Sequence, residues 1–201
     1  MLMSVFIKNY IKNEKDIIVS TFHYDKEITT AKITNVFIRK FFKTLNPING
    51  DYILMYYKPI MDKIINILSK TNFKIKVYGK FDNYYKKNNI EYFPLSYEEF
   101  SKDLAGCKAL FCTAGNQLLG EARYFGKPIF AIPITNQYEQ YVNAFYVKDL
   151  KIGTYSKIEH VNEKAILDFL NNLNYYEPHN VDGTEFAINI IKEYTKCKKE
   201  K

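Results

Sequence analysis

The chain has 201 residues, with 29 Lys and Arg against 22 Asp and Glu, which gives a net charge of +7 at pH 7. This length accommodates one domain with a full core, or one domain plus a fragment of another. No run of the sequence approaches the ~20 apolar residues that a membrane-spanning helix needs.

The basic balance can indicate an acidic partner, such as nucleic acid, a phospholipid surface or an anionic nucleotide sugar. Only two of the basic residues, Arg39 and Arg123, are arginines. Planar, two-pronged recognition of phosphate favours arginine, so we do not expect a nucleic-acid partner. Peripheral contact with a membrane surface stays open.

The three cysteines, Cys107, Cys112 and Cys197, are odd in number and lack the spacing of metal ligands. Free Cys within an apolar strand behaves as a small hydrophobic residue. The apolar part of the N-terminal stretch, residues 1–10, is also too short for a signal peptide. We therefore expect a reduced, cytoplasmic protein that holds no metal.

Two strands are predicted in the first part of the chain, over residues 16–22 and 33–38. A mixed segment before them favours a helix. The turn-forming sequence from Asn46 to Gly50 follows and is the best candidate for a domain boundary. It divides the chain into residues 1–50 and 51–201.

Strands and helices alternate after this boundary. The alternating pattern at 73–79 favours a strand near the edge of a sheet, and the polar stretch 80–89 favours a loop or a short helix. The unalternating run 109–112 indicates a strand that is buried on both faces. Further strands are predicted at 52–57 and 90–93, with helices after Pro59 and after the N-cap Ser96. This order predicts an α/β fold with a mainly parallel sheet.

The strand at 109–112 ends in Thr113-Ala114-Gly115, and a helix is predicted to begin near Asn116 or Gln117. The small residues Ala114 and Gly115 let a ligand approach the backbone. The free N–H groups and the dipole of the helix favour an anion such as a diphosphate. Glu121, one to two turns into the helix, is close enough to its start to reach a ribose or sugar hydroxyl.

Gly126-Lys127-Pro128 is predicted to end this helix. The next strand, 129–132, leads into the loop 133–140 at its carboxyl end, where open α/β sheets bind ligands. Taken alone, each feature has an ordinary explanation, since a lone Gly115 can serve packing and Glu121 can be a solvated helix residue. Their fixed order favours a ligand site.

The stretch resembles the C-terminal, donor-binding half of GT-B glycosyltransferases, particularly the peptidoglycan N-acetylglucosaminyltransferase group and related archaeal-type predicted transferases. The shared pattern is a Gly-containing turn, a Glu six residues later, G-x-P, a strand that ends in Pro, and Q-x-x-N-A. Here it reads Gly115, Glu121, Gly126-Lys127-Pro128, Pro133 and Gln140-Tyr141-Val142-Asn143-Ala144. The resemblance implies a Rossmann-like three-layer domain over 51–201, preceded by a short remnant of the acceptor domain and its linker.

The resemblance also implies a nucleotide-sugar donor, most commonly a UDP-sugar, and no cofactor. In relatives, the strand end at 93–95 grips the base, the turn after the next strand holds the diphosphate, and the loop before Q-x-x-N-A binds the sugar. The implied nucleotide-binding residues are Phe93, Pro94, Leu95, Thr113, Ala114, Gly115, Asn116, Gln117 and Glu121. The implied sugar-binding residues are Glu139, Gln140 and Asn143.

Two departures from the family pattern affect the expected chemistry. Lys58-Pro59 replaces a glycine-rich loop, and Thr113 stands where retaining relatives carry a second carboxylate, which favours an inverting reaction. An inverting reaction needs a general base, which relatives supply from the N-terminal domain. His23 is more often incidental in such a position, so no catalytic residue is assigned. The resemblance therefore implies an acceptor-binding partner chain or a homo-oligomer.

Two alternatives remain. A truncated homologue can bind a nucleotide sugar or a partner protein without catalysis, as the absent base and glycine loop suggest. A sugar-nucleotide epimerase shares the architecture, but it requires additional acidic and histidine residues around the sugar, which the sequence does not offer.

Overall fold

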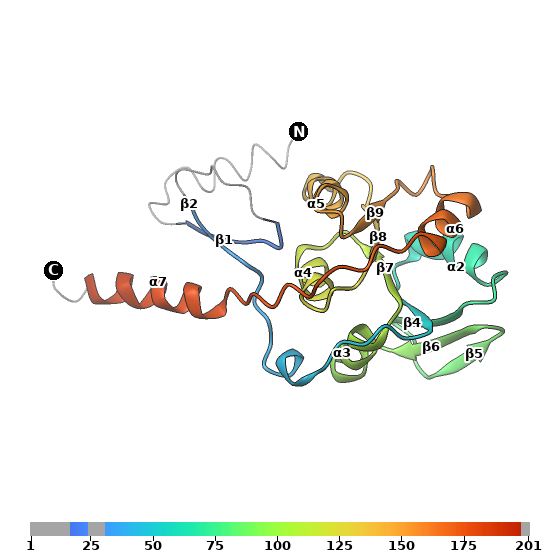
Figure 1. Ribbon diagram of the computed structural model, residues 1–201, viewed down its shortest axis with the longest axis horizontal. Helices are drawn as coiled ribbons and strands as arrows, with labels where there is room; N and C mark the ends of the chain where they lie inside the picture. The colour runs from blue at the N-terminus through green and yellow to red at the C-terminus, as the bar shows by residue number, and fades with distance from the viewer. Residues whose placement is uncertain (1–16, 24–30, 198–201) are drawn as a thin grey trace.

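The computed structural model describes residues 17–23 and 31–197, and the predicted helix before residue 16 lies outside them (Figure 1). A seven-stranded sheet dominates this part, in the order β5-β6-β4-β3-β7-β8-β9. Every pairing is parallel except that of β5 with β6. The strands are β3 (Tyr52–Tyr56), β4 (Lys74–Gly79), β5 (Tyr85–Lys87), β6 (Ile90–Pro94), β7 (Ala109–Thr113), β8 (Ile129–Ile132) and β9 (Gly153–Tyr155).

Helices cover both faces of the sheet, so the domain has three layers. Leu54, Leu110 and Cys112 point to the face that carries α3 (Tyr97–Gly106), α4 (Asn116–Tyr124) and α5 (Tyr138–Asp149). Met55 and Phe111 point to the other face, which carries η2 (Pro59–Met61), α2 (Asp62–Leu68) and α6 (Glu163–Asn171). The predicted Rossmann-like α/β fold is confirmed.

The strand β4 is central, although its alternating pattern predicted a position near an edge. It pairs with β3 on one side and with β6 on the other. Lys76, which creates the alternation, is accommodated because its Nζ donates to Asp103 Oδ1 at 2.7 Å and lies 4.2 Å from the centroid of the Tyr52 ring. A polar partner on α3 therefore allows a charged residue in an interior strand.

Two shorter predictions also need correction. The predicted loop or helix at 80–89 contains β5, which pairs with β6 as a hairpin around Asn88, whose φ of 55° is left-handed. The strand predicted at 33–38 is β2, over Ala31–Thr34, and residues 35–38 are not in a strand. Val36 and Phe37 of this segment instead contact α4, at Gly120 and Gln117.

A second, smaller unit is formed by β1 (Ile17–Ser20), β2 and the last helix, α7 (Thr184–Cys197). The two strands pair in parallel, and Lys32 of β2 lies 5.0 Å from the ring of Tyr194 on α7. In Figure 1 this unit lies to one side of the seven-stranded sheet, next to α4 and α5. None of the described helices has the length and apolar character needed to cross a membrane.

Two chain segments join the units and contact each other at Asp182. The backbone N–H groups of Ile38 and Thr184 and the hydroxyl of Thr184 donate to Asp182 Oδ1, and Lys43 lies 2.6 Å from Oδ2. The short helix η1 (Phe42–Thr44) then buries Phe42 against Phe125. The connection between the units is therefore held by a carboxylate with four donors.

Candidate functional site

The order of the strands locates the expected ligand crevice. Read in chain order without β5, the parallel strands follow the pattern 3-2-1-4-5-6, so the direction of the crossovers reverses between β3 and β7. In open α/β sheets, ligands bind outside the carboxyl ends of the strands at such a switch point. The turn that follows β7 is therefore the first place to look for a site.

This turn leads directly into α4, as predicted. Gly115 is the N-cap of α4, with φ −77° and ψ 129°, and no side chain caps the helix among the described residues. A Cβ placed on Gly115 would meet no described atom within 4 Å. The first N–H groups of a helix lack intrahelical partners, so this end of α4 offers uncapped donors beside open space.

A buried amide from α5 fixes the turn. Asn143 is 3% exposed, and its Nδ2 donates to the carbonyl oxygen of Ala114 at 3.0 Å. Ala114 is itself buried, as is most of Thr113. Asn143, predicted to bind the donor sugar, thus lies beneath the turn that would hold the phosphates.

Asn116, the first residue of α4, contacts the smaller unit. Its Oδ1 accepts from the Phe22 N–H at 3.1 Å, and its Nδ2 donates to the Ser20 carbonyl oxygen at 3.0 Å. His23, which follows Phe22 in the chain, stacks on Tyr146 of α5 with ring centroids 3.8 Å apart. The side chain of Asn116 therefore joins the end of β1 to the start of α4.

Glu121 is 5% exposed on α4, and its Oε1 has two partners. Gln117 Nε2 donates to it at 2.9 Å, and an Arg39 guanidinium nitrogen lies 3.6 Å away. Burial raises the pKa of Glu121, while the Gln117 hydrogen bond and the Arg39 charge act in the opposite direction. No local pattern pairs Arg39 with Glu121, because the two residues lie far apart in the chain.

The predicted base-binding segment, Phe93 to Leu95, lies at the carboxyl end of β6. Phe93 stacks on Tyr78 with centroids 4.9 Å apart and contacts the ring of Tyr84 at 5.1 Å. Leu95 is 49% exposed and precedes the N-cap of α3. The backbone here is flanked by aromatic side chains on the same edge of the sheet as the turn after β7.

The predicted sugar-binding loop follows β8 and begins α5. Gln140 Oε1 accepts from the Ile134 N–H at 3.0 Å, and its Nε2 donates to Gln137 Oε1 at 2.7 Å. Asn136 adopts a left-handed φ of 65°, which tightens this loop. Glu139, in the first turn of α5, is exposed. Gln140 thus shapes the loop, while Glu139 faces solvent.

The end of β3 lacks the glycine-rich loop of the family pattern. Tyr57 donates from its hydroxyl to Asp62 at 2.7 Å, and Lys58 lies 5.3 Å from the ring centroid of Tyr56. Pro59 then begins η2. This side of the switch point therefore presents side chains rather than a backbone cradle.

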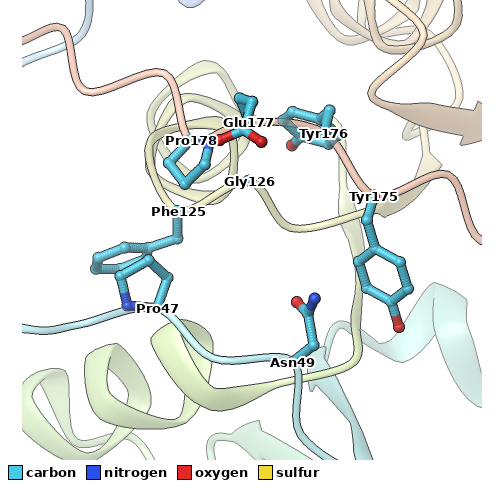
Figure 2. Close-up of a pocket in the computed structure, with 8 residues that line it drawn as sticks. All are labelled: Pro47, Asn49, Phe125, Gly126, Tyr175, Tyr176, Glu177 and Pro178. Carbon is cyan, nitrogen blue, oxygen red and sulfur yellow. The ribbon is translucent and has the colours of Figure 1, made fainter.

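Two cavities among the described residues lie away from this turn. One, of about 280 Å³, is lined by residues that precede β3 and β8 and by the segment 175–178, and it lies at the amino edge of the sheet. Figure 2 shows Asn49 pointing into it, with Phe125 and Tyr175 at its sides. A second cavity lies against β9 and α6. No group of three or more His, Cys, Asp or Glu that could hold a metal ion is found in 17–23 and 31–197.

Solved glycosyltransferases share this fold. A chain of MurG from Acinetobacter baumannii matches with a TM-score of 0.54 and 12% identity, over 77% of this chain and 52% of that one. Os79 from O. sativa matches with a TM-score of 0.58 and 13% identity, over 85% of this chain and 49% of that one. UGT2 from Phytolacca americana matches with a TM-score of 0.55 and 13% identity, over 85% of this chain and 45% of that one.

This chain therefore spans about half the length of these three solved chains, between 45% and 52%. No curated protein sequence matches it. The resemblance to the donor-binding half of GT-B enzymes is confirmed at the level of the fold. The family model described as "Glycosyl transferase family 1" matches residues 1–174, which is most of the chain, and the protein belongs to that family.

Proposed function

We propose that this chain is the donor-binding part of a glycosyltransferase that uses a UDP-sugar, and that it transfers a hexose or N-acetylhexosamine with inversion. The uncapped start of α4 at the switch point of the sheet carries the proposal. There the helix N–H groups face open space at Gly115, which suits a diphosphate.

In this proposal the start of α4 stabilises the departing diphosphate. Negative charge develops on the diphosphate as the bond between its oxygen and the anomeric carbon of the sugar breaks, and fixed N–H dipoles stabilise this charge without a metal ion. The buried amide of Asn143 keeps the turn in place, so little reorganisation is needed during the reaction. Glu121 accepts from the ribose hydroxyls, and Glu139 and Gln140 contact the sugar.

UDP is the donor nucleotide that we favour. The structure of UGT2 from Phytolacca americana is a complex with UDP-2fluoro-glucose, and its fold is shared by this chain. The carboxyl end of β6, at Phe93 to Leu95, is the proposed base site. Thr113 in place of a second carboxylate favours inversion over retention.

The general base and the acceptor site come from outside the described donor half. We propose that an acceptor-binding chain, or a second copy, supplies both, and that the assembly works at a membrane surface. The net charge of +7 favours association with anionic lipid or another acidic partner. The alternative is a non-catalytic homologue that binds a nucleotide sugar or a partner protein, which the missing glycine loop after β3 favours.

A thermal-shift titration tests donor binding. The purified chain is heated with UDP, UDP-GlcNAc, UDP-glucose, GDP or ADP. A ligand at a hundred times its Kd stabilises the folded state by about 2.7 kcal/mol, which a melting curve detects. We expect stabilisation by the uridine nucleotides, its loss in Glu121→Ala and its retention in Glu163→Ala, a change on the distant helix α6.

The outcomes separate the candidates. Stabilisation by UDP and turnover on addition of the acceptor-binding partner support the enzyme. Stabilisation without turnover, in the presence of that partner, favours the non-catalytic homologue. No shift with any nucleotide contradicts donor binding by this chain.

A further inference from the structure

Arg39 is half-exposed, yet its guanidinium is held on two sides. Its central carbon lies 4.1 Å from the centroid of the Tyr97 ring, at the start of α3. One guanidinium nitrogen lies 3.6 Å from Glu121 Oε1, and the two side chains are 52% and 6% exposed. Stacking on an aromatic face restricts the guanidinium plane, so Arg39 approaches Glu121 from a fixed direction.

The linker that carries Arg39 is itself fastened to α4. Gln117 Nε2 donates both to the Phe37 carbonyl oxygen and to Glu121 Oε1, each at 2.9 Å. Val36 packs so closely on Gly120 that a Cβ there would lie 2.3 Å from a Val36 methyl carbon. The linker thus contacts the Glu121 carboxylate in two ways: directly through the Arg39 charge, and indirectly through the Gln117 amide, which also donates to the linker backbone.

We propose that Arg39 is a positioning residue of the nucleotide site. From the linker, outside the helix that carries Glu121, Arg39 holds the Glu121 carboxylate in the orientation that accepts hydrogen bonds from the ribose hydroxyls. This inference rests on the proposed function. Gln117 and Arg39 both contact Oε1 of Glu121, so they set the orientation of the carboxylate together. A carboxylate that is held in place loses less entropy when it accepts hydrogen bonds from a diol.

The charge of Arg39 matters as well as its geometry. Burial disfavours the ionised form of Glu121, and Arg39 is the charged group that counteracts it. An ionised carboxylate accepts from both ribose hydroxyls, whereas a protonated one has to donate its own hydrogen. Loss of Arg39 should therefore weaken recognition of the ribose more than binding of the phosphates at α4.

Calorimetric titrations with UDP and 2′-deoxy-UDP measure this recognition separately from phosphate binding. The variants are Arg39→Ala, Arg39→Lys, Tyr97→Leu and the matched control Lys40→Ala, which changes the next, exposed residue. Circular dichroism verifies that each variant is folded. Hydrogen bonds to a charged group contribute about 1.5–3 kcal/mol, so the wild type should prefer UDP by roughly tenfold or more.

We expect Arg39→Ala to bring the UDP preference close to one, with a much smaller effect on 2′-deoxy-UDP. Arg39→Lys should restore part of the preference because it keeps the charge, Tyr97→Leu should reduce it, and Lys40→Ala should keep it. If Arg39→Ala does not fold, Arg39→Lys and Tyr97→Leu carry the test.

Three results would overturn the inference. The first is a wild type that binds UDP and 2′-deoxy-UDP equally, and the second is an Arg39→Ala variant that retains the wild-type preference. In both cases the proposed donor binding survives. A wild-type chain that binds neither nucleotide overturns the proposed function, and the role of Arg39 with it.

Discussion

Replacement of Gly115 by Ala should remove nucleotide binding and leave the fold almost unchanged. Gly115 has φ −77° and ψ 129°, which any residue adopts, and an added Cβ meets no described atom within 4 Å. Ala is a poorer N-cap than Gly and costs up to about 1 kcal/mol. The reduced freedom of the unfolded chain returns about 0.4–1 kcal/mol. The two effects oppose each other, so the free energy of unfolding should change by less than about 1 kcal/mol.

The added methyl group would occupy the space beside the uncapped N–H groups of α4. We expect the affinity for UDP, measured by calorimetry, to fall at least tenfold, or about 1.4 kcal/mol. Urea unfolding of the same preparation measures stability. Wild-type affinity in a folded Gly115→Ala variant would refute the placement of the diphosphate at this turn. A loss of several kcal/mol in stability would refute the claim that Gly115 faces open space.

Three further predictions concern stability. Gly120→Ala should lower the free energy of unfolding by roughly 1–2 kcal/mol in urea titrations, because overpacking against Val36 outweighs better helix propensity, and Val36→Ala should relieve it. Burial raises the pKa of Glu121 above the ordinary Glu value of about 4.3 that applies in the unfolded chain. Ionisation of Glu121 therefore lowers the stability of the wild type as pH rises from about 4.3 through the folded pKa, and Glu121→Gln should melt at progressively higher temperature than the wild type over that range. Partial burial of Asp182 raises its pKa, but hydrogen bonds from Lys43, Thr184 and the backbone lower it to about 2. The ionised carboxylate therefore stabilises the fold above about pH 3.9, and this contribution is lost as pH falls towards 2. Asp182→Asn should lower the free energy of unfolding by roughly 1–2 kcal/mol at pH 7 and should lack this acid transition. The ion pair with Lys43 contributes little to this figure, because the Lys43 side chain is half-exposed.

Local patterns predicted the elements of the donor half well. The run Ala109 to Cys112 is buried on every residue, as a strand covered by helices on both faces must be. Gly126 adopts the left-handed φ of 68° expected after a helix. Ser96 accepts from the Glu99 N–H as the predicted N-cap. These signals are short-range, since each depends on residues within one turn or one strand.

The contacts that organise the candidate site join residues far apart in the sequence. Asn143 is implied as a sugar-binding residue only by the family resemblance, and the fold shows that its amide holds the turn at Ala114 from another helix. No local pattern singles out Arg39, and only the fold brings it to Glu121. The alternation in β4 misled for the same reason, because Asp103 supplies a partner for Lys76 from α3.

Several long-range contacts converge on α4, which connects the proposed donor site to the smaller unit. Asn116 holds the end of β1 through Ser20 and Phe22, and the Arg123 side chain donates to the Phe22 carbonyl oxygen. Gln117 holds the linker. Transfer between two bound substrates requires their reacting atoms to be aligned closely. A ligand that orders the first turn of α4 would therefore also fix the segment that leads to the smaller unit, and occupancy of the proposed donor site would be coupled to the position of that unit.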